Sequence, residues 1–418
     1  MKKVLFVTTR LIYPVNDGRK VVLYNYCKGL AEQHNCEVRL FSLIDEEDKE
    51  IKQPDFISKV YFGSLPNKLE KIKSLLINSI ILNKWPLQVS LYYSTKAQKQ
   101  LNMILEEYEP DIVICDMART AEYLKDLDES KYNKILDMDD LLSKRYGRQV
   151  ESGLISENSI GAYGKKLPSF MLEIAKNSNI MMNIIKKESC LLSKYEINIS
   201  KYYRKIVFVS PIEAKDFNEK IGEDKSIDIT IGVDYDYFSE EVTLNKKNNY
   251  IVFLGNMYVA HNKDAVNSFI TEVFPSVLKK MPNCVFRIVG RCSQEYKNEM
   301  EKNLNVEVTG EVNDIRKYVQ DCTVAVAPLK YGSGIKTKIL ETMAMGVPIV
   351  TNEIGNEGLG LLNNKQVIIE ENENNLAEKI VDLLKNYELQ RNLVYEGKLY
   401  VKTNHRWDAI LAKFSEIL

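Results

Sequence analysis

The sequence predicts an α/β fold that consists of two doubly wound parallel-sheet domains. The chain has 418 residues, which is more than one ordinary hydrophobic core accommodates. Short apolar runs alternate with stretches of helical periodicity through both halves, a pattern typical of parallel sheets covered by helices on both faces. The alternation is interrupted by the polar run SEEVTLNKKNN at 239–249, which we interpret as a linker.

Residues 1–238 are expected to form the first domain. Between its first two strands, GRKVVLYNYCKGLAEQ places Val22, Tyr26 and Leu30 at helical spacing. A helical insertion is expected over about 150–204, and its stripe of Met and Ile side chains is typical of core packing. The expected strands are 3–9, 36–43, 58–63, 111–115, 134–138, 205–210 and 226–231.

Residues 250–400 are expected to form the second domain, followed by a final helix within 401–418. Because ligands bind beyond the carboxyl ends of the strands in open parallel sheets, two such domains facing each other predict a site in a central cleft. The expected strands are 250–255, 284–290, 305–310, 323–329, 348–352 and 366–370, with helices at about 262–280, 313–320, 335–345 and 374–400.

Composition and charge narrow the function classes. The formal net charge is -1, so no global field recruits nucleic acid. The seven cysteines are scattered without a CxxC pair, and the three histidines form no ligand-spaced cluster, so neither disulfides nor a metal is expected. The apolar run at the N-terminus is too short for a signal peptide and is interpreted as a buried first strand. These features predict a cytoplasmic protein.

One segment has two interpretations. NKLEKIKSLLINSIILNKW (67–85) combines lysines with an Ile/Leu-rich face and ends in Trp85, as a helix at a membrane surface does. Such contact would make the protein peripheral at the inner face of the membrane. The alternative, which the sequence favours, is a helix that packs on its own sheet.

The stretch YGSGIKTKILETMAMGVPIV (331–350) predicts an anion-binding turn. Gly332 and Gly334 allow backbone conformations in which several N–H groups point at one spot, and the following helix adds its positive end. Lys336 and Lys338 lie in the first turn of that helix, where cations are disfavoured unless an anion is present. The alternative is an ordinary turn with solvated lysines. The turn is not a P-loop, because G-x-x-x-x-G-K-[ST] does not occur.

Further candidate site residues lie in the same helix and after other strands. Glu341 is a carboxylate on a mostly apolar helix and needs a partner, which a ribose diol could supply. Gly255 follows the first strand of the second domain, with Asn262 as an expected N-cap and Lys263 at the helix start. In the first domain, the turn after Pro14 brings Asp17, Gly18 and Arg19 to the same edge, and Asp137, Asp139 and Asp140 end a strand. Such like-charge neighbours are costly unless they order an acceptor, stabilise positive charge, bind a metal or cap a helix.

With these blocks in order, the chain resembles the family 4 (group 1) glycosyltransferases of GT-B fold, over nearly its whole length. The resemblance rests on PLKYGSGIKTKILETMAMGVPIVTNEIGNEGL, on PVNDGRKVVLYNYCKGLAEQHNCEVRLFSL, and on YIVFLGNMYVAHNKDAV with VTGEVNDIRKYVQDCTVAVAPL. The sugar transferases of exopolysaccharide and capsule biosynthesis are the most similar in character. The last helix, with Trp407, is similar to the one that returns to the N-terminal domain in this family.

The resemblance implies retaining transfer of a sugar from a nucleotide-diphosphate sugar to an acceptor hydroxyl, generally without a metal. Glu341 matches the glutamate that holds the ribose, while Ser333 stands where the family usually has a glutamate that meets the donor sugar. The implied diphosphate and sugar contacts are Gly18, Gly255, Asn256, Lys263, Gly332, Ser333, Gly334, Ile335, Lys336 and Thr337. The implied nucleoside contacts are Thr309, Gly310, Val312 and Glu341.

Lys336 and Asp140 are the expected catalytic residues, and Asp17, Arg19, Asp137 and Asp139 are expected on the acceptor side. A lysine and a helix N-terminus would stabilise the leaving diphosphate, and a carboxylate would stabilise an oxocarbenium-like centre. UDP is the favoured nucleotide and GDP stays open; the acceptor is a glycan or a lipid-linked molecule. The alternatives are a catalytically weak GT-B protein that binds a nucleotide sugar or a partner transferase, which Ser333 keeps open, and a nucleotide-sugar epimerase. A dehydrogenase is disfavoured, because no GxGxxG follows the first strand.

Overall fold

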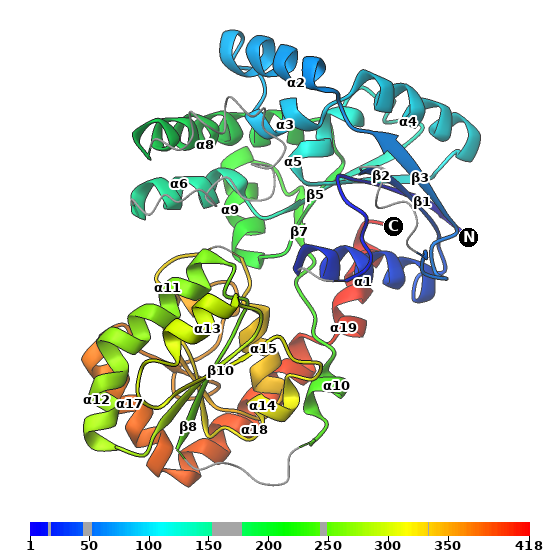
Figure 1. The fold of residues 1–418 in the computed structure, drawn as a ribbon. Coiled ribbons are helices and arrows are strands. Elements are labelled where there is room, and N and C mark those ends of the chain that lie inside the picture. Colours follow the sequence, from blue (N-terminus) through cyan, green and yellow to red (C-terminus); the bar gives the residue numbers. More distant parts are fainter. Residues whose placement is uncertain (16–17, 45–51, 153–177, 243–248, 333) are drawn as a thin grey trace. The chain divides into compact units, whose positions relative to one another are not determined.

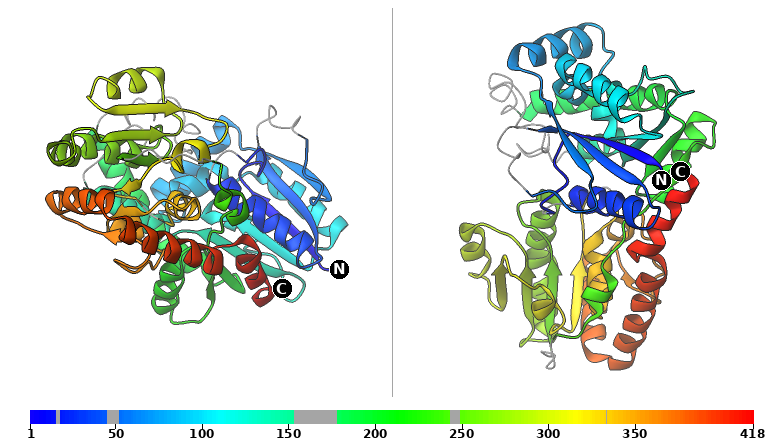
Figure 2. Two further views of the ribbon diagram at one scale, coloured as in Figure 1. Left: turned by 90° about the horizontal axis from the view of Figure 1, so that it is seen from below. Right: turned by 90° about the vertical axis from the view of Figure 1, so that its right-hand side faces the viewer.

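The computed structural model describes residues 1–15, 18–44, 52–152, 178–242, 249–332 and 334–418. The chain divides into two compact units: unit 1 comprises Met1–Thr230 with Leu411–Leu418, and unit 2 comprises Ile231–Ile410. Each unit is an α/β structure built on a parallel sheet, as seen in Figure 1 and in the further views of Figure 2. The predicted α/β fold with two doubly wound sheets is confirmed.

Unit 1 contains a sheet of seven parallel strands in the order β3-β2-β1-β4-β5-β6-β7. The order reverses between β1 and β4, so the crossovers change direction there, as in other doubly wound sheets. All seven expected strands are present. Their bounds are β1 Lys3–Thr8, β2 Glu37–Ile44, β3 Lys59–Ser64, β4 Ile112–Asp116, β5 Asn133–Asp139, β6 Lys205–Phe208 and β7 Ser226–Asp228.

Helices cover both faces of this sheet. In β1, Leu5 and Val7 belong to the core that also includes side chains of α4 and α8. Val4 and Phe6 point to the opposite face, because side chains alternate along a strand, and all four side chains are fully buried. The helices of unit 1 are α1 Gly18–Glu32, α2 Lys68–Ser74 with a π-helical continuation Leu75–Ile81, α3 Leu87–Tyr92, α4 Thr95–Tyr108, α5 Met117–Thr120, α6 Leu142–Ser152, α8 Ser178–Ser200 and α9 Pro211–Ile221. Of the expected insertion 150–204, residues 153–177 lie outside the described residues.

Unit 2 contains a six-stranded parallel sheet in the order β10-β9-β8-β11-β12-β13, which reverses between β8 and β11. Ile251 and Phe253 of β8 belong to one core and Val252 points to the other face, and all three are fully buried. The strands are β8 Tyr250–Leu254, β9 Val285–Val289, β10 Val306–Gly310, β11 Val324–Ala327, β12 Ile349–Thr351 and β13 Ile368–Ile369, so the six expected strands are present.

The helices of unit 2 correct three expectations. The helix expected over 374–400 is two helices, since Asn386 ends α17 and caps α18 by accepting from Leu389 N at 3.0 Å. The N-cap of α11 is Val259, not Asn262. The helix expected over 313–320 is a single turn, α14. The helices are α10 Tyr235–Ser239, α11 Ala260–Ser268, α12 Phe274–Lys280, α13 Gln294–Met300, α14 Arg316–Val319, α15 Thr337–Ala344, α16 Glu353–Asn356, α17 Glu373–Lys385, α18 Tyr387–Asn404 and α19 Trp407–Ala412.

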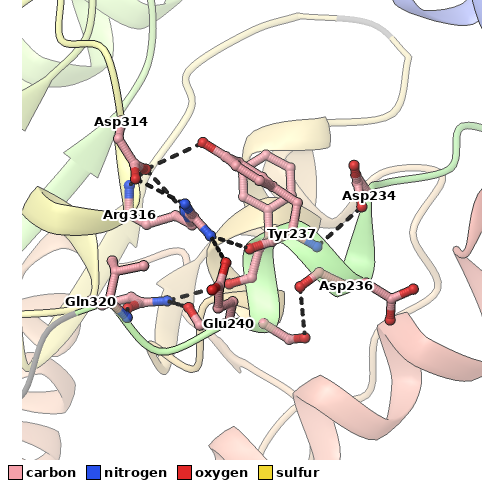
Figure 3. A network of polar contacts seen from close by, with 10 residues as sticks. Asp234, Asp236, Tyr237, Glu240, Asp314, Arg316 and Gln320 are labelled. Carbon is pink, nitrogen blue, oxygen red and sulfur yellow. Dashed lines mark hydrogen bonds and ion pairs between the residues drawn. The ribbon is translucent and has the colours of Figure 1, made fainter.

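Unit 2 begins before the expected linker. Figure 3 shows the polar network that attaches α10 to this unit: Arg316 donates to Tyr237 O at 2.8 Å and to Glu240 Oε2 at 2.7 Å. Gln320 donates to Glu240 O at 2.7 Å in the same network. The expected end of the first domain at residue 238 therefore differs from the structure, because these long-range contacts hold 231–242 on unit 2. Residues 243–248 of the expected linker 239–249 lie outside the described residues.

The chain ends in unit 1. Phe414 packs edge-on against Tyr26 of α1, with ring centroids 5.1 Å apart, and Asn133 donates to Ile417 O at 3.1 Å. Gly29 of α1 leaves room for Leu411, since a Cβ at Gly29 would lie 2.8 Å from its Cδ1. The expected 401–418 segment thus joins unit 1 only from Leu411 onward, and α18 before it belongs to unit 2.

The cysteines and the hydropathy of the helices complete the description of the chain. All seven cysteines are free, and five of them are buried, as expected for small core residues. Within the described part of the chain, no helix has the length and apolar character needed to span a bilayer.

Candidate functional site

Three neighbouring strands of unit 2 end in closely packed glycine loops. Gly255 follows β8, Gly290 follows β9 and Gly310 ends β10. Gly290 has φ of 136°, and a Cβ on it would lie only 2.0 Å from the Gly255 carbonyl oxygen. Its amide donates to Gly310 O at 3.3 Å. These glycines allow the loops at the carboxyl edge of the sheet to approach one another.

Both glycines of the turn before α15 have positive φ, which their residue type allows. Gly332 has φ of 140° and Gly334 has φ of 69°, both in the region that favours glycine. A Cβ on Gly334 would meet no atom within 4 Å, so this side of the turn is open. Lys336 is the N-cap residue of α15, and its Nζ donates to Gly334 O at 2.5 Å. Ser333 lies outside the described residues.

Helix α11 braces this turn and the start of α15. Tyr331 donates its hydroxyl to Asp264 Oδ2 at 2.6 Å, and Lys338 donates Nζ to Asn262 Oδ1. Asn262 in turn donates Nδ2 to Asn256 O at 3.0 Å. The expected N-cap Asn262 is therefore a bridge between the β8 loop and α15. The bridge fixes the lysine relative to the open side of the turn.

The pKa of Lys338 is lower than that of an ordinary lysine. Burial, and then the neighbouring charge of Lys336, lower the pKa of Lys338 to about 7. Both lysines lie at the N-terminal end of α15, where the helix dipole opposes them. A bound anion would offset all three penalties, so this end of α15 is arranged to receive negative charge.

One turn further along α15, Glu341 is partly exposed, while protein atoms surround its carboxyl. Burial raises the pKa of its carboxyl to about 7. Among the described residues, no hydrogen-bond donor reaches its carboxylate, whereas most buried polar groups have a partner. The side chain can therefore accept hydrogen bonds from hydroxyl groups of a ligand.

The remaining predicted residues of unit 2 are placed as follows. Lys263 is exposed, and its Nζ lies 5.5 Å from the centre of the Tyr296 ring on α13. Thr309 donates Oγ1 to Gly310 O at 2.9 Å, and Val312 is partly exposed just beyond β10. Ile335 is buried before α15 and Thr337 is its first residue. The ligand contacts of these residues stay predictions.

In unit 1, Arg19 gathers three carboxylates. It lies in the first turn of α1, and its guanidinium is 2.7 Å from Asp116 Oδ1, 2.7 Å from Asp137 Oδ2 and 2.9 Å from Asp139 Oδ1. Asp116 was not predicted, although it follows the apolar run of β4 just as Asp137 falls near the end of β5. A parallel sheet brings such strand ends to one edge.

This cluster carries more negative than positive charge. Burial raises the pKa of Asp137 to about 6, against the opposing effect of Arg19, and Asp116 and Asp139 raise it further. Asp139 has φ of 65° and is 20% exposed, so it is the member that reaches the surface. The buried guanidinium is thus the charge partner that makes these neighbouring carboxylates tolerable.

The other predicted residues of unit 1 lie around this cluster. Asp140 is buried and accepts from Nε of Arg145 at 2.9 Å. Gly18 begins α1, and a Cβ there would meet no atom within 4 Å, while Asp17 lies outside the described residues. The catalytic role of Asp140 and the acceptor roles of Arg19 and the acidic residues stay predictions.

Comparison with known proteins agrees with this fold. Residues 248–386 match the family model described as Glycosyl transferases group 1. A Klebsiella pneumoniae relative, an uncharacterized 44.6 kDa protein in the cps region, is 23% identical, with 97% of each chain covered. A glycosyltransferase from Rickettsia africae has a TM-score of 0.63 at 15% identity, covering 100% of this chain and 97% of that one. Alr3699/HepE of Anabaena in complex with UDP has a TM-score of 0.65 at 11% identity, covering 100% and 99%.

At these identities the structural likeness shows the fold, and the family match adds the class of enzyme. The match covers the strands and turns of unit 2 that carry the glycine turn and Glu341. The chain therefore has the fold of the glycosyltransferases with which it is compared, and its residues 248–386 match the group 1 glycosyltransferase family.

Proposed function

We propose that this enzyme transfers a sugar from a UDP-sugar to an acceptor hydroxyl, with retention of anomeric configuration, in the synthesis of a cell-surface polysaccharide. The observation that carries the proposal is the arrangement along α15. An open glycine turn leads into α15, Lys336 caps the helix, and Lys338 and Glu341 follow in its first two turns.

The diphosphate is proposed to bind at the start of α15. Backbone N–H groups of the turn, the helix N-terminus and Lys336 would face it, and the ammonium of Lys338 would add charge. As the glycosidic bond breaks, the leaving UDP gains negative charge, so groups fixed in advance stabilise the transition state more than the ground state. The positive charge comes from these lysines and the helix, and the proposal therefore includes no metal.

The ribose is proposed to bind at Glu341. Its carboxylate can accept from the two vicinal ribose hydroxyls, since the described residues supply no other donor. From Thr337 to Glu341 the helix rises by roughly 6 Å at 1.5 Å per residue. One nucleoside diphosphate lying along α15 could thus contact both ends of this stretch.

The choice of UDP, the polysaccharide product and retention are inferred from similar proteins. The Anabaena protein is described in complex with UDP, and the Klebsiella pneumoniae relative is described as lying in the cps region. The Anabaena protein supports a UDP-sugar donor for this chain, and the Klebsiella pneumoniae relative supports a polysaccharide product. Retention follows from the family resemblance, and we propose Lys336 and Asp140 as the catalytic residues and the cytoplasm as the site of action.

Thermal unfolding with added nucleotides tests the donor site. A ligand that binds only the folded protein raises its apparent stability by mass action. We expect UDP and UDP-sugars to raise the melting temperature of the wild type, and Glu341→Ala to remove the shift. Glu388→Ala, a change at an exposed glutamate of unit 2, is the matched control and should keep it.

A shift with GDP and none with UDP would refute the choice of nucleotide. No shift with any nucleotide would refute the donor site on α15. If the shift survives Glu341→Ala, the ribose contact is wrong. Retention is checked separately, by NMR of the anomeric proton in the product.

A further inference from the structure

The segment Lys68–Ile81 of unit 1 presents large apolar side chains to solvent. Its first part is α2, which continues directly into the π-helical Leu75–Ile81. Leu69 is 79% exposed and Ile81 is 69% exposed. The exposed apolar side chains in and next to the segment are Leu69, Leu76, Ile77, Ile80, Ile81 and Leu82. Single exposed apolar residues are ordinary, but a contiguous group marks an interaction surface.

Packing within unit 1 does not account for these side chains. The buried residues of the segment are Leu75 and Ser79, and Ser79 Oγ lies 2.8 Å from Ser90 Oγ of α3. A surface helix usually turns its apolar stripe inward and its polar residues outward. Here a serine faces inward while four Leu and Ile residues of the same turns face outward. The favoured expectation of a helix that packs on its own sheet is met only in part: Leu75 belongs to the core of unit 1, whereas most of the apolar side chains of the segment are exposed.

The charges around the apolar side chains are positive. Lys68, Lys73 and Lys84 are exposed, and none forms an ion pair within 4 Å among the described residues, although the charge of Lys84 acts on the carboxyl of Glu122. Glu70 is used locally, because its Oε2 accepts from Asn67 N at 2.8 Å in a capping box. Segment 67–85 has four lysines and one glutamate, a net charge of +3 in a chain whose formal net charge is -1. A partner for this surface should be apolar and carry negative charge at its rim.

Trp85 does not belong to this surface. It is only partly exposed, and its ring packs edge-on against Tyr93, with centroids 5.1 Å apart. The structure therefore does not present Trp85 as an aromatic anchor for a membrane, as one of the two interpretations of the sequence had it. Apolar contact has to come from the aliphatic side chains.

We propose that this surface docks onto a bilayer that contains anionic phospholipid. We name it the apolar–lysine surface and define it as Lys68, Leu69, Lys73, Leu76, Ile77, Ile80, Ile81, Leu82 and Lys84. The aliphatic side chains insert at the boundary between head groups and acyl chains, and the lysines meet lipid phosphates. The proposal goes beyond sugar transfer and uses no residue of the donor site.

Vesicle flotation without nucleotide tests the proposal on the full chain. The vesicles contain phosphatidylcholine alone, or phosphatidylcholine with phosphatidylglycerol. We expect binding to the anionic vesicles that weakens with added salt, because salt screens the lysines. The variant Ile77→Ser/Ile81→Ser/Leu82→Ser should bind at least about tenfold more weakly, since it removes apolar area that enters the bilayer. The variant Lys68→Gln/Lys73→Gln/Lys84→Gln should lose the preference for anionic vesicles.

The matched control replaces two exposed apolar residues elsewhere in unit 1, Met103→Ser/Ile212→Ser. It should bind like the wild type, and thermal unfolding should show that all three variants stay folded, because the changed side chains are exposed. Binding to neither kind of vesicle, or equal losses in the control, would overturn the proposal. Dimers in gel filtration that only the apolar variant abolishes, without vesicle binding, would show that a second copy covers the surface instead.

Discussion

Protons exchanged when UDP binds would report on Lys338 directly. In the free enzyme its pKa is about 7, so about half of the molecules carry a neutral amine at pH 7. A diphosphate beside it favours the ammonium. Raising the pKa by about 2 units requires ~2.7 kcal/mol, which is less than the ~4 kcal/mol between unit charges 4 Å apart at an effective dielectric of 20. Lys338 should therefore take up about half a proton per UDP at pH 7.

Glu341 should exchange protons in the opposite direction. Its pKa is also about 7, and it accepts from two ribose hydroxyls best as the ionised carboxylate. Binding should thus release up to about half a proton at pH 7. The two effects nearly cancel in the wild type. Affinity should be highest near pH 7, because Glu341 is protonated below this pH and Lys338 is neutral above it.

Single substitutions separate the two effects. Titration calorimetry in buffers of different ionisation enthalpy gives the number of protons as the slope of the observed enthalpy. Glu341→Gln should show uptake of about half a proton and Lys338→Met release of about half a proton. The control Lys402→Met, at an exposed lysine of α18, should match the wild type. If Glu341→Gln binds UDP without proton uptake, Lys338 does not face the diphosphate and the reasoning fails.

Three further predictions concern stability. Arg19→Met should lower the free energy of unfolding, measured by urea denaturation, by about 3–5 kcal/mol, because it leaves buried carboxylates without their partner. A loss below about 1 kcal/mol would contradict the ion pairs of this cluster. Gly290→Ala should lower the free energy of unfolding by at least about 2 kcal/mol, since the new Cβ would meet a carbonyl oxygen. Gly334→Ala should lower it by only about 1–2 kcal/mol and chiefly weaken UDP binding. Equal losses of stability in the two variants would contradict the open turn. Glu188 of α8 is fully buried and accepts from Leu87 N at 2.6 Å, and burial raises its pKa to about 7. Its contribution to stability is therefore present at low pH and lost as pH rises through 7, by up to about 3 kcal/mol between about pH 5 and about pH 8. Glu188→Gln should flatten this slope in urea unfolding.

The two sheets and the turn before α15 could be predicted from local sequence patterns. Central strands such as β1 and β8 are apolar runs whose residues are buried on both faces, and such a run has few alternatives in a folded chain. The glycine turn could be predicted from the sequence in the same way. Gly332 and Gly334 occupy conformations that other residues rarely adopt, and the two lysines at the helix start oppose the helix dipole. These signals are local, so they are visible without contacts.

Contacts between residues far apart in the sequence could not be predicted in this way. Asp116 joins the Arg19 cluster because β4 and β5 are neighbours, and Asn262 bridges to Lys338 because α11 lies beside α15. The same holds for α10, which Arg316 attaches to unit 2, and for the outward turn of Ile77 and its neighbours. Apolar periodicity shows that a helix has one apolar face, but whether this face is buried depends on what the rest of the chain packs against it.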